Sequence, residues 1–174
     1  MKRSSKKISQ EVRYLTRGAL IAALYVGLSY VSTVFGLASG AIQFRISEML
    51  TALPVFFPEA IPGLFVGCIL SNIIGGCLPW DIVFGSLATL IGAIGCYMLR
   101  KLPEKFKWVA TLPNFLSNAI IVPFVLIYAY GVTNGYFALM LTVGIGELVC
   151  GVLGGSVLYY ALKSSKALNM TINN

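Results

Sequence analysis

The stretch YLTRGALIAALYVGLSYVSTVF, residues 14–35, decides the class of fold. Beyond Arg17 it contains no charged side chain, and it is as long as the roughly 20 apolar residues with which a helix crosses a bilayer. The rest of the 174-residue chain has the same character: hydrophobic residues make up 57%, charged residues only 11%, and the mean hydropathy is +0.84. We therefore predict an all-α membrane protein rather than a soluble domain.

Five further apolar stretches follow, so the sequence predicts six transmembrane helices in all. The predicted spans cover residues 14–35, 46–57, 61–78, 82–99, 108–130 and 136–162. The second is short for a full crossing and contains Pro54, which lacks a backbone donor, so we expect it to be broken or tilted. The spans form one transmembrane domain, residues 14–162, between a basic N-terminal segment, residues 1–13, and a C-terminal tail, residues 163–174.

Positive charge marks the ends of the predicted spans. All but one of the 13 Lys and Arg residues lie before the first span or in its first turn, between the fourth and the fifth, or after the sixth. With six spans these three places share one side of the membrane, and an excess of Lys and Arg is typical of the cytoplasmic side. We therefore expect both termini in the cytoplasm and a multi-pass protein in the plasma membrane of a bacterial cell. No basic stripe is interleaved with aromatic residues, so the net charge of +7 does not indicate nucleic-acid binding.

Several classes of function lack the residues that they require. The chain has no histidine, and its four cysteines form no CxxC pair, so neither a metal site nor a haem site is expected. It has no GxxxxGK[ST] phosphate-binding loop, so ATP hydrolysis by that route is excluded. Without histidine no Ser-His-Asp or Cys-His arrangement exists. We predict that the protein is not an enzyme and has no cofactor.

The stretch IQFRISEM, residues 42–49, places polar side chains in otherwise apolar surroundings. Arg45 is the one cation outside the predicted cytoplasmic segments, and Glu48 follows it by three positions. On a helix these two side chains can form an ion pair, and one interpretation is an internal pair that fixes the outer loop. The other is a ligand pocket that opens to the outside, because acids at membrane depth are costly and need a partner or a cavity.

The pocket interpretation gathers polar residues from several predicted helices. Hydrogen bonds between helices explain one or two such residues, but not all of them. Two carboxylates, amides and one guanidinium suit a small planar molecule rich in N–H groups, with a second carboxylate to offset an ammonium group. Phe44, Trp80 and Phe84 can supply a stacking face. The predicted substrate-binding residues are Glu48, Glu147, Arg45, Asn72, Asn118, Gln43 and Asp81.

Small residues repeat every four positions in the first predicted span, at Ala19, Ala23 and Gly27. Such stripes let two helices approach closely in lipid. This stripe either packs inside the protein or provides a docking face for a partner membrane subunit. Other glycine pairs of the chain have the same spacing, so the spacing by itself favours packing within the chain.

Longer stretches of the chain resemble a known family. Residues 42–76, IQFRISEMLTALPVFFPEAIPGLFVGCILSNIIGG, with DIVFGSLATLIGA at 81–93 and VGIGELV at 143–149, are similar to the QueT family. Its members are substrate-binding (S) components of energy-coupling factor (ECF) vitamin transporters. The resemblance covers residues 17–162. It implies six helices, import of a queuosine precursor, and association with a transmembrane coupling subunit and two cytoplasmic ATPase subunits.

The resemblance also bears on the ligand and on the small-residue stripe. The imported precursor would be a 7-deazaguanine base with an aminomethyl arm, or queuine. The stripe resembles the contact of the family with its coupling subunit, with Gly27 in place of a third alanine. The resemblance thus favours docking over internal packing.

We therefore predict a binding subunit that captures a queuosine precursor from outside and delivers it with an ATP-driven partner complex. Glu48 and Glu147 are expected to accept hydrogen bonds from the base or its ammonium arm, and Arg45 to donate to the carbonyl or to hold Glu48. The alternatives are a stand-alone carrier or channel for a small solute, an S component for another vitamin-like heterocycle, an intramembrane enzyme, and a structural assembly subunit. The side-chain types do not separate the aminomethyl base from queuine, guanine or a pterin.

Overall fold

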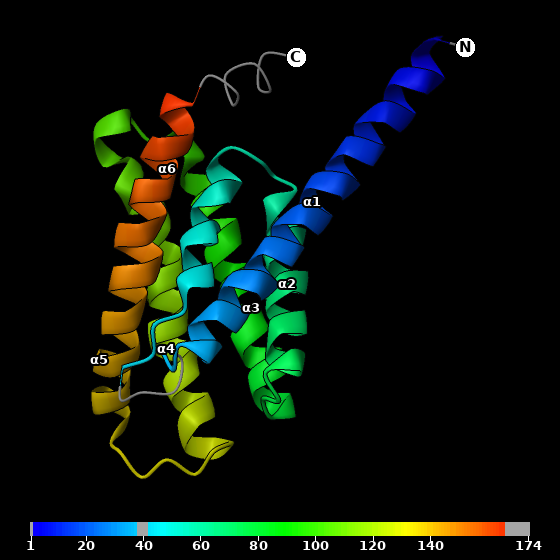
Figure 1. Cartoon of the computed structure of the whole chain (residues 1–174). Coiled ribbons are helices and arrows are strands. Elements are labelled where there is room, and N and C mark those ends of the chain that lie inside the picture. Colours follow the sequence, from blue (N-terminus) through cyan, green and yellow to red (C-terminus); the bar gives the residue numbers. More distant parts are fainter. Residues whose placement is uncertain (1, 38–41, 166–174) are drawn as a thin grey trace.

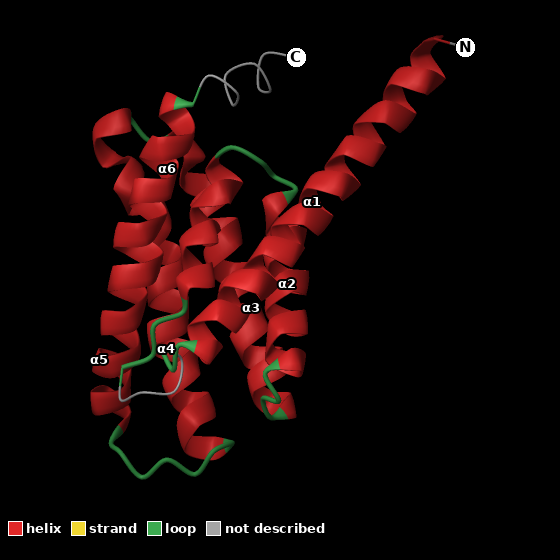
Figure 2. Ribbon diagram, viewed as in Figure 1, coloured by secondary structure: helices red, strands yellow, loops and turns green. Residues whose placement is uncertain are grey.

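The computed structural model describes residues 2–37 and 42–165, with side chains from Gln10 onward. Within these ranges every regular element is a helix and none is a strand, which confirms the all-α prediction (Figure 2). Most of the predicted C-terminal tail, residues 166–174, lies outside the described residues.

The helices follow the order of the predicted spans (Figure 1). They are α1 (Lys2–Val34), η1 (Ile46–Val55), α2 (Ala60–Ile74), α3 (Pro79–Met98), η2 (Leu99–Lys101), η3 (Glu104–Thr111), α4 (Leu112–Tyr128), α5 (Tyr136–Glu147), η4 (Leu148–Gly154) and α6 (Gly155–Ser164). Three of them, η1, η2 and η3, are 3₁₀ helices, and η4 is a π-helix. Because α5, η4 and α6 follow one another without a gap, the last predicted span is one helix with a π-helical middle.

Four helical stretches are long and apolar enough to cross a membrane, which makes the chain a membrane protein. They are Gln10–Val34, Pro79–Lys101, Glu104–Tyr128 and Tyr136–Ser164. The helices η1 and α2 are apolar but shorter, with 10 and 15 residues. A helix of that length rises at most about 22 Å, less than the roughly 30 Å of a hydrocarbon core. Six complete crossings therefore stay a prediction.

The helix η1 lies among the others and contacts α1, α2, α3, α6 and η4. Most of its side chains are buried, including Glu48 and Pro54. A 3₁₀ helix rarely exceeds one turn, and Pro54 has no N–H to donate inside it. The expected irregularity of the second predicted span is therefore confirmed. Its buried position makes η1 the element that carries polar groups into the middle of the protein.

The helices α1 and α2 touch backbone to backbone. A Cβ added to Gly63 would lie 2.6 Å from the carbonyl oxygen of Gly18, and one added to Gly67 would lie 2.9 Å from Cβ of Tyr25 and 3.0 Å from the carbonyl oxygen of Ala22. Small residues at these positions are what permits the approach. The surface of α1 that packs inside the protein is therefore the one with Gly18, Ala22 and Tyr25.

The stripe at Ala19, Ala23 and Gly27 lies on a different surface of α1. All three residues are exposed, and a Cβ added to Gly27 would meet no atom within 4 Å. The interpretation in which this stripe packs inside the chain is therefore wrong. The stripe is free to contact lipid or another protein.

The regions rich in Lys and Arg gather at one end of the molecule. Figure 1 shows the start of α1 and the end of α6 at the same end, with the first part of α1 extending beyond the other helices. The segment η3 belongs to this end, because Lys163 of α6 forms an ion pair of 2.7 Å with Glu104 of η3 and Tyr159 donates to the same carboxylate at 3.2 Å. This arrangement agrees with the predicted common side for these segments. That this side is the cytoplasm stays a prediction.

Candidate functional site

Two buried carboxylates share one amide group in the middle of the protein. Asn114 of α4 donates from Nδ2 to Oε2 of Glu48 on η1, at 3.0 Å, and to Oε2 of Glu147 at the end of α5, at 3.1 Å. The exposed fractions are 1% for Glu48, 7% for Glu147 and 0% for Asn114. An amide NH₂ carries two hydrogens, so each carboxylate accepts one of them. We call Glu48 and Glu147 the carboxylate pair.

Neighbouring donors fix the orientation of this amide. Asn118, one turn further along α4, donates to the carbonyl oxygen of Asn114 at 3.1 Å and to its Oδ1 at 3.3 Å. With Oδ1 occupied as an acceptor, the NH₂ of Asn114 points to the carboxylates. The hydroxyl of Tyr25 on α1 donates to Oε1 of Glu48. Glu48 therefore accepts a hydrogen bond at each oxygen, while Glu147 accepts one from Asn114.

Glycines bring three backbone segments close to these groups. A Cβ added to Gly92 of α3 would lie 2.5 Å from Cα of Asn114, and one added to Gly151 of η4 would lie 3.0 Å from Oε2 of Glu147. A Cβ added to Gly146 would overlap the carbonyl of Gln43, in the segment that leads into η1. Larger side chains at these positions would displace the groups that hold the carboxylate pair.

The π-helical segment η4 begins directly after Glu147. Such segments are rare and occur often at functional sites, because the wider turn changes the direction of neighbouring side chains. Gly151, within η4, lies against the carboxylate of Glu147. The position of Glu147 thus depends on the irregular helix that follows it.

Arg45 does not form the predicted ion pair with Glu48. It is the residue before η1, with an extended backbone (φ −100°, ψ 99°), so the two side chains are not one turn apart on a helix. Among the described residues the ion pairs are Arg17–Glu59 and Lys163–Glu104. The interpretation of an internal Arg45–Glu48 pair is therefore wrong. Arg45 is half-buried, and its charge acts on Tyr25, Asp81 and Glu48.

Asn72 and Asp81 belong to a second polar group. Asn72 of α2 donates to the backbone carbonyl of Asp81 at 3.5 Å, and the hydroxyl of Tyr130 donates to Oδ2 of Asp81 at 2.9 Å. The same hydroxyl accepts from the N–H of Leu78 at 3.2 Å. These contacts join the ends of α2, α3 and α4. Within the described ranges no hydrogen bond joins Asn72 or Asp81 directly to Glu48 or Glu147, although Asn72 also donates to Sγ of Cys68 at 3.7 Å.

Gln43 lines a small pocket beside the carboxylate pair. The pocket has a volume of about 260 Å³ and lies between the segment before η1, the α4–α5 connection and α5. It is lined by Gln43, Leu126, Val132, Asn134, Leu139, Thr142 and Val143. Val143 precedes Glu147 by one helical turn, so the pocket lies one turn from the buried carboxylate on the same face of α5.

The two rings predicted to stack on a ligand lie elsewhere. Trp80 and Phe84 stack on each other with ring centres 6.0 Å apart, and both are exposed on α3. They line an apolar groove of about 620 Å³ with residues of α4, and none of the predicted polar site residues lines it. The prediction that these two rings form a stacking face beside the carboxylates is therefore wrong.

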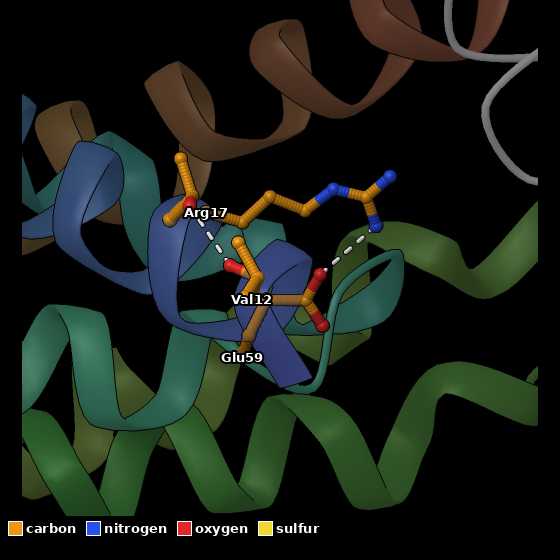
Figure 3. A network of polar contacts seen from close by, with 4 residues as sticks. Val12, Arg17 and Glu59 are labelled. Carbon is orange, nitrogen blue, oxygen red and sulfur yellow. Dashed lines mark hydrogen bonds and ion pairs between the residues drawn. The ribbon is translucent and has the colours of Figure 1, made fainter. Parts of the chain in front are cut away.

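A third buried glutamate, Glu59, has an ordinary structural partner. Its Oε1 accepts from Nη1 of Arg17 at 3.0 Å, as Figure 3 shows, and Glu59 is 5% exposed. The guanidinium of Arg17 also lies 5.3 Å from the ring centre of Phe57. This pair joins α1 to the start of α2, and its charges are balanced within the protein.

Sequence reasoning missed two residues of the site, Asn114 and Tyr25. Asn114 precedes Asn118 by four positions, so the two share a helical face, and this spacing was the available signal. Asn114 falls in the half of the predicted fifth span nearer the basic linker, which separated it from the residues assigned to the outer half. Tyr25 is one of nine tyrosines, and nothing in its local sequence distinguishes it.

Comparisons with known proteins agree with the resemblance. A family model described as QueT transporter matches residues 15–164. A protein named "Queuosine precursor transporter QueT" from Lactococcus lactis subsp. cremoris (strain MG1363) is 34% identical over 92 residues, which cover 52% of this chain and 53% of that protein. The match thus spans about half the length of this relative. No solved structure matches the chain.

Proposed function

The chain belongs to the QueT transporter family, and we propose that it is the substrate-binding subunit of an ECF-type importer. In this role it captures a queuosine precursor from outside the cell and delivers it with an ATP-driven partner complex. The family consists of transporters, which confirms that the chain is not an enzyme.

The carboxylate pair is the observation that carries this proposal. The N1–H and 2-amino group of a 7-deazaguanine present two parallel donors, and a carboxylate accepts such an edge with its two oxygens. A second carboxylate close by accepts an amino group on the arm of the base. Glu48 and Glu147 are the two acceptors, and Asn114, which donates to both, holds them close together.

The pocket lined by Gln43 supports entry from outside. Val132 and Asn134, which line it, belong to the connection between α4 and α5, at the end of the molecule opposite the two chain ends (Figure 1). If the basic segments lie in the cytoplasm, this end faces outward. A ligand that enters here reaches Glu147 after one helical turn. Gln43 lines this pocket, whereas Asn72 and Asp81 brace the helix ends.

The exposed stripe on α1 supports docking to a partner subunit. Ala19, Ala23 and Gly27 form a smooth surface, bordered by the exposed side chains of Leu20 and Leu24. A flat strip of this kind allows a partner helix to approach closely in the membrane. Transport energy then comes from ATPase subunits of the partner complex.

Titration calorimetry on the purified chain in detergent tests the ligand. We expect tight binding of aminomethyl-deazaguanine or queuine, and none of guanine or riboflavin measured in parallel. Binding of riboflavin instead would still support a vitamin transporter, but it would contradict a queuosine precursor as the substrate. If a folded sample binds none of the four compounds, the proposal is wrong.

A bulky substitution in the stripe tests the docking face. We expect Ala23→Leu to prevent co-purification with a co-expressed coupling subunit, while ligand affinity and melting temperature stay unchanged. Ala138→Leu is the matched control, because Ala138 is an exposed alanine on α5. Equal co-purification of both variants would contradict this docking face. Ligand flux into liposomes that contain the chain alone would favour a stand-alone carrier.

A further inference from the structure

The charges around the carboxylate pair do not balance. Among the described residues away from the basic end of the molecule there are three acids, Glu48, Glu147 and Asp81, and one cation, Arg45. Asp81 has its own donor in Tyr130. Even if the charge of Arg45 is counted entirely toward the pair, one buried negative charge is left without a cation. Burying an ionised carboxylate without a partner in a membrane protein is costly.

The remaining titratable groups near the pair offer no further cation. The titratable groups that lie near Glu48, Glu147 or Arg45 are Tyr25 of α1, Cys68 of α2, Asp81 of α3 and Cys150 of η4. The helix α4 contributes the neutral Asn114. At the other end of the molecule, Lys163 and Tyr159 of α6 contact Glu104 of η3 instead.

The geometry brings the two carboxylates into one electrostatic unit. Both Oε2 atoms lie within 3.1 Å of the same nitrogen of Asn114, and both side chains are almost fully buried. Two carboxylates that share a site in low dielectric repel each other strongly when both are ionised. Glu48 accepts hydrogen bonds at both oxygens, which favours its ionised form. Glu147 accepts one from Asn114, so the proton belongs on Glu147.

From this arrangement, and resting on the proposed function, we propose that the carboxylate pair holds one proton in the ligand-free protein and exchanges it for the ammonium group of the ligand. The ammonium enters as a cation, the carboxylic proton of Glu147 leaves to water, and both carboxylates are ionised in the complex. The net charge of the buried site is the same before and after binding. No covalent bond of the ligand forms or breaks.

The exchange defines the class of substrate more narrowly than the family does. A base with a protonated amine on its arm replaces the proton, whereas an uncharged base of the same shape leaves it in place. The site therefore selects cationic deazaguanines, such as the aminomethyl base and queuine, over neutral ones. Binding of a cationic ligand weakens as the pH falls, because protons compete for the same carboxylates.

Calorimetry of the unmodified chain in two buffers tests the exchange directly. Aminomethyl-deazaguanine is titrated at one neutral pH in phosphate and in Tris, whose enthalpies of ionisation differ. We expect heats that differ by the release of about one proton per bound ligand, and an affinity that falls about tenfold per unit of pH on the acidic side. The same base with an uncharged hydroxymethyl arm is the ligand control, and its heats should agree between the buffers.

Two variants test whether the released proton comes from Glu147. Glu147→Gln replaces the protonated carboxyl by a neutral group of the same shape, so we expect weaker binding without proton release. Glu59→Gln is the matched control, because Glu59 is equally buried but paired with Arg17, and proton release should persist. If Glu147→Gln does not fold, as judged by its melting curve, the two-buffer result on the unmodified chain still decides the matter.

The outcomes separate this inference from the function on which it rests. Tight binding of aminomethyl-deazaguanine with equal heats in both buffers would overturn the proton exchange and leave the proposed function standing. Equal affinity for the aminomethyl and hydroxymethyl bases would overturn the charge selection. Failure of a folded sample to bind either base, or queuine, would overturn the proposed function itself.

Discussion

Glu48 and Glu59 lie on either side of one short stretch of chain, and both are buried, with exposed fractions of 1% and 5%. Glu59 has a cation, Arg17, at 3.0 Å. Glu48 has a tyrosine, an amide and a second carboxylate. The difference is one of charge balance. The charge of Glu59 is balanced by Arg17 within the fold, whereas under the proposed function the ligand balances the charge of Glu48.

The largest effect is expected from Glu48→Gln. A charge-assisted hydrogen bond is worth about 1.5 to 3 kcal/mol, so the affinity for aminomethyl-deazaguanine should fall about 100-fold. The melting temperature should stay the same or rise, because one carboxylate of the crowded pair is removed. Calorimetry and a thermal melt of the purified variant measure both quantities. An unchanged affinity would mean that Glu48 does not bind the ligand, and the proposed difference between Glu48 and Glu59 would then be wrong.

Glu59→Gln should give the opposite result. Loss of the ion pair with Arg17 should lower the free energy of unfolding by about 1 kcal/mol, a modest value because the side chain of Arg17 is 33% exposed. Ligand affinity should not change. Chemical unfolding in detergent and calorimetry test the two statements. A large loss of affinity in this variant would mean that the two glutamates do not have separate roles.

The smallest effect is expected from Tyr25→Phe. The variant removes the hydroxyl that donates to Oε1 of Glu48 and leaves the packing of the ring against α2 in place. A hydrogen bond of this kind contributes about 0.5 to 1.5 kcal/mol, so we expect a loss of affinity of about three- to tenfold. Calorimetry beside Glu48→Gln measures it. If the loss equals that of Glu48→Gln, Tyr25 contacts the ligand itself.

The all-helical fold could be predicted from the composition and from the positions of the apolar stretches, because each span is visible in the sequence as a run of apolar residues. The apolar stretches placed the helices, and Pro54 with the short length of its span indicated the irregular η1. The start of α1 could not be placed, since the polar residues before Tyr14 continue the helix back to Lys2 without an apolar pattern. Likewise, spacing could not identify which small-residue surface packs inside, because two surfaces of α1 satisfy the same motif.

The site could be predicted in part. Acids within an apolar chain are costly to bury and are therefore candidates for function, and this pointed to Glu48 and Glu147. The buried Glu59, paired with Arg17, shows that such an acid can also be structural. Their shared partner Asn114 was missed, because the depth of a side chain depends on how helices are staggered, and a linear sequence does not state it. The predicted ion pair between Arg45 and Glu48 was wrong for a related reason. It required both residues to lie on one helix, but η1 begins only after Arg45.

The π-helical segment η4 has a consequence for how this sequence tolerates change in length. A π turn contains more residues than an α turn, so residues 148–154 hold about one surplus residue between α5 and α6. Deleting one of them would let the last helix run as an uninterrupted α-helix, with Glu147 and Tyr159 in nearly the same relative orientation, because the wider π turn takes in the extra residue without an added rotation. The surplus residue instead determines which residue of η4 lies against the carboxylate of Glu147, which is Gly151 here. The loss of a single codon would thus change this contact while every side chain of the site remained.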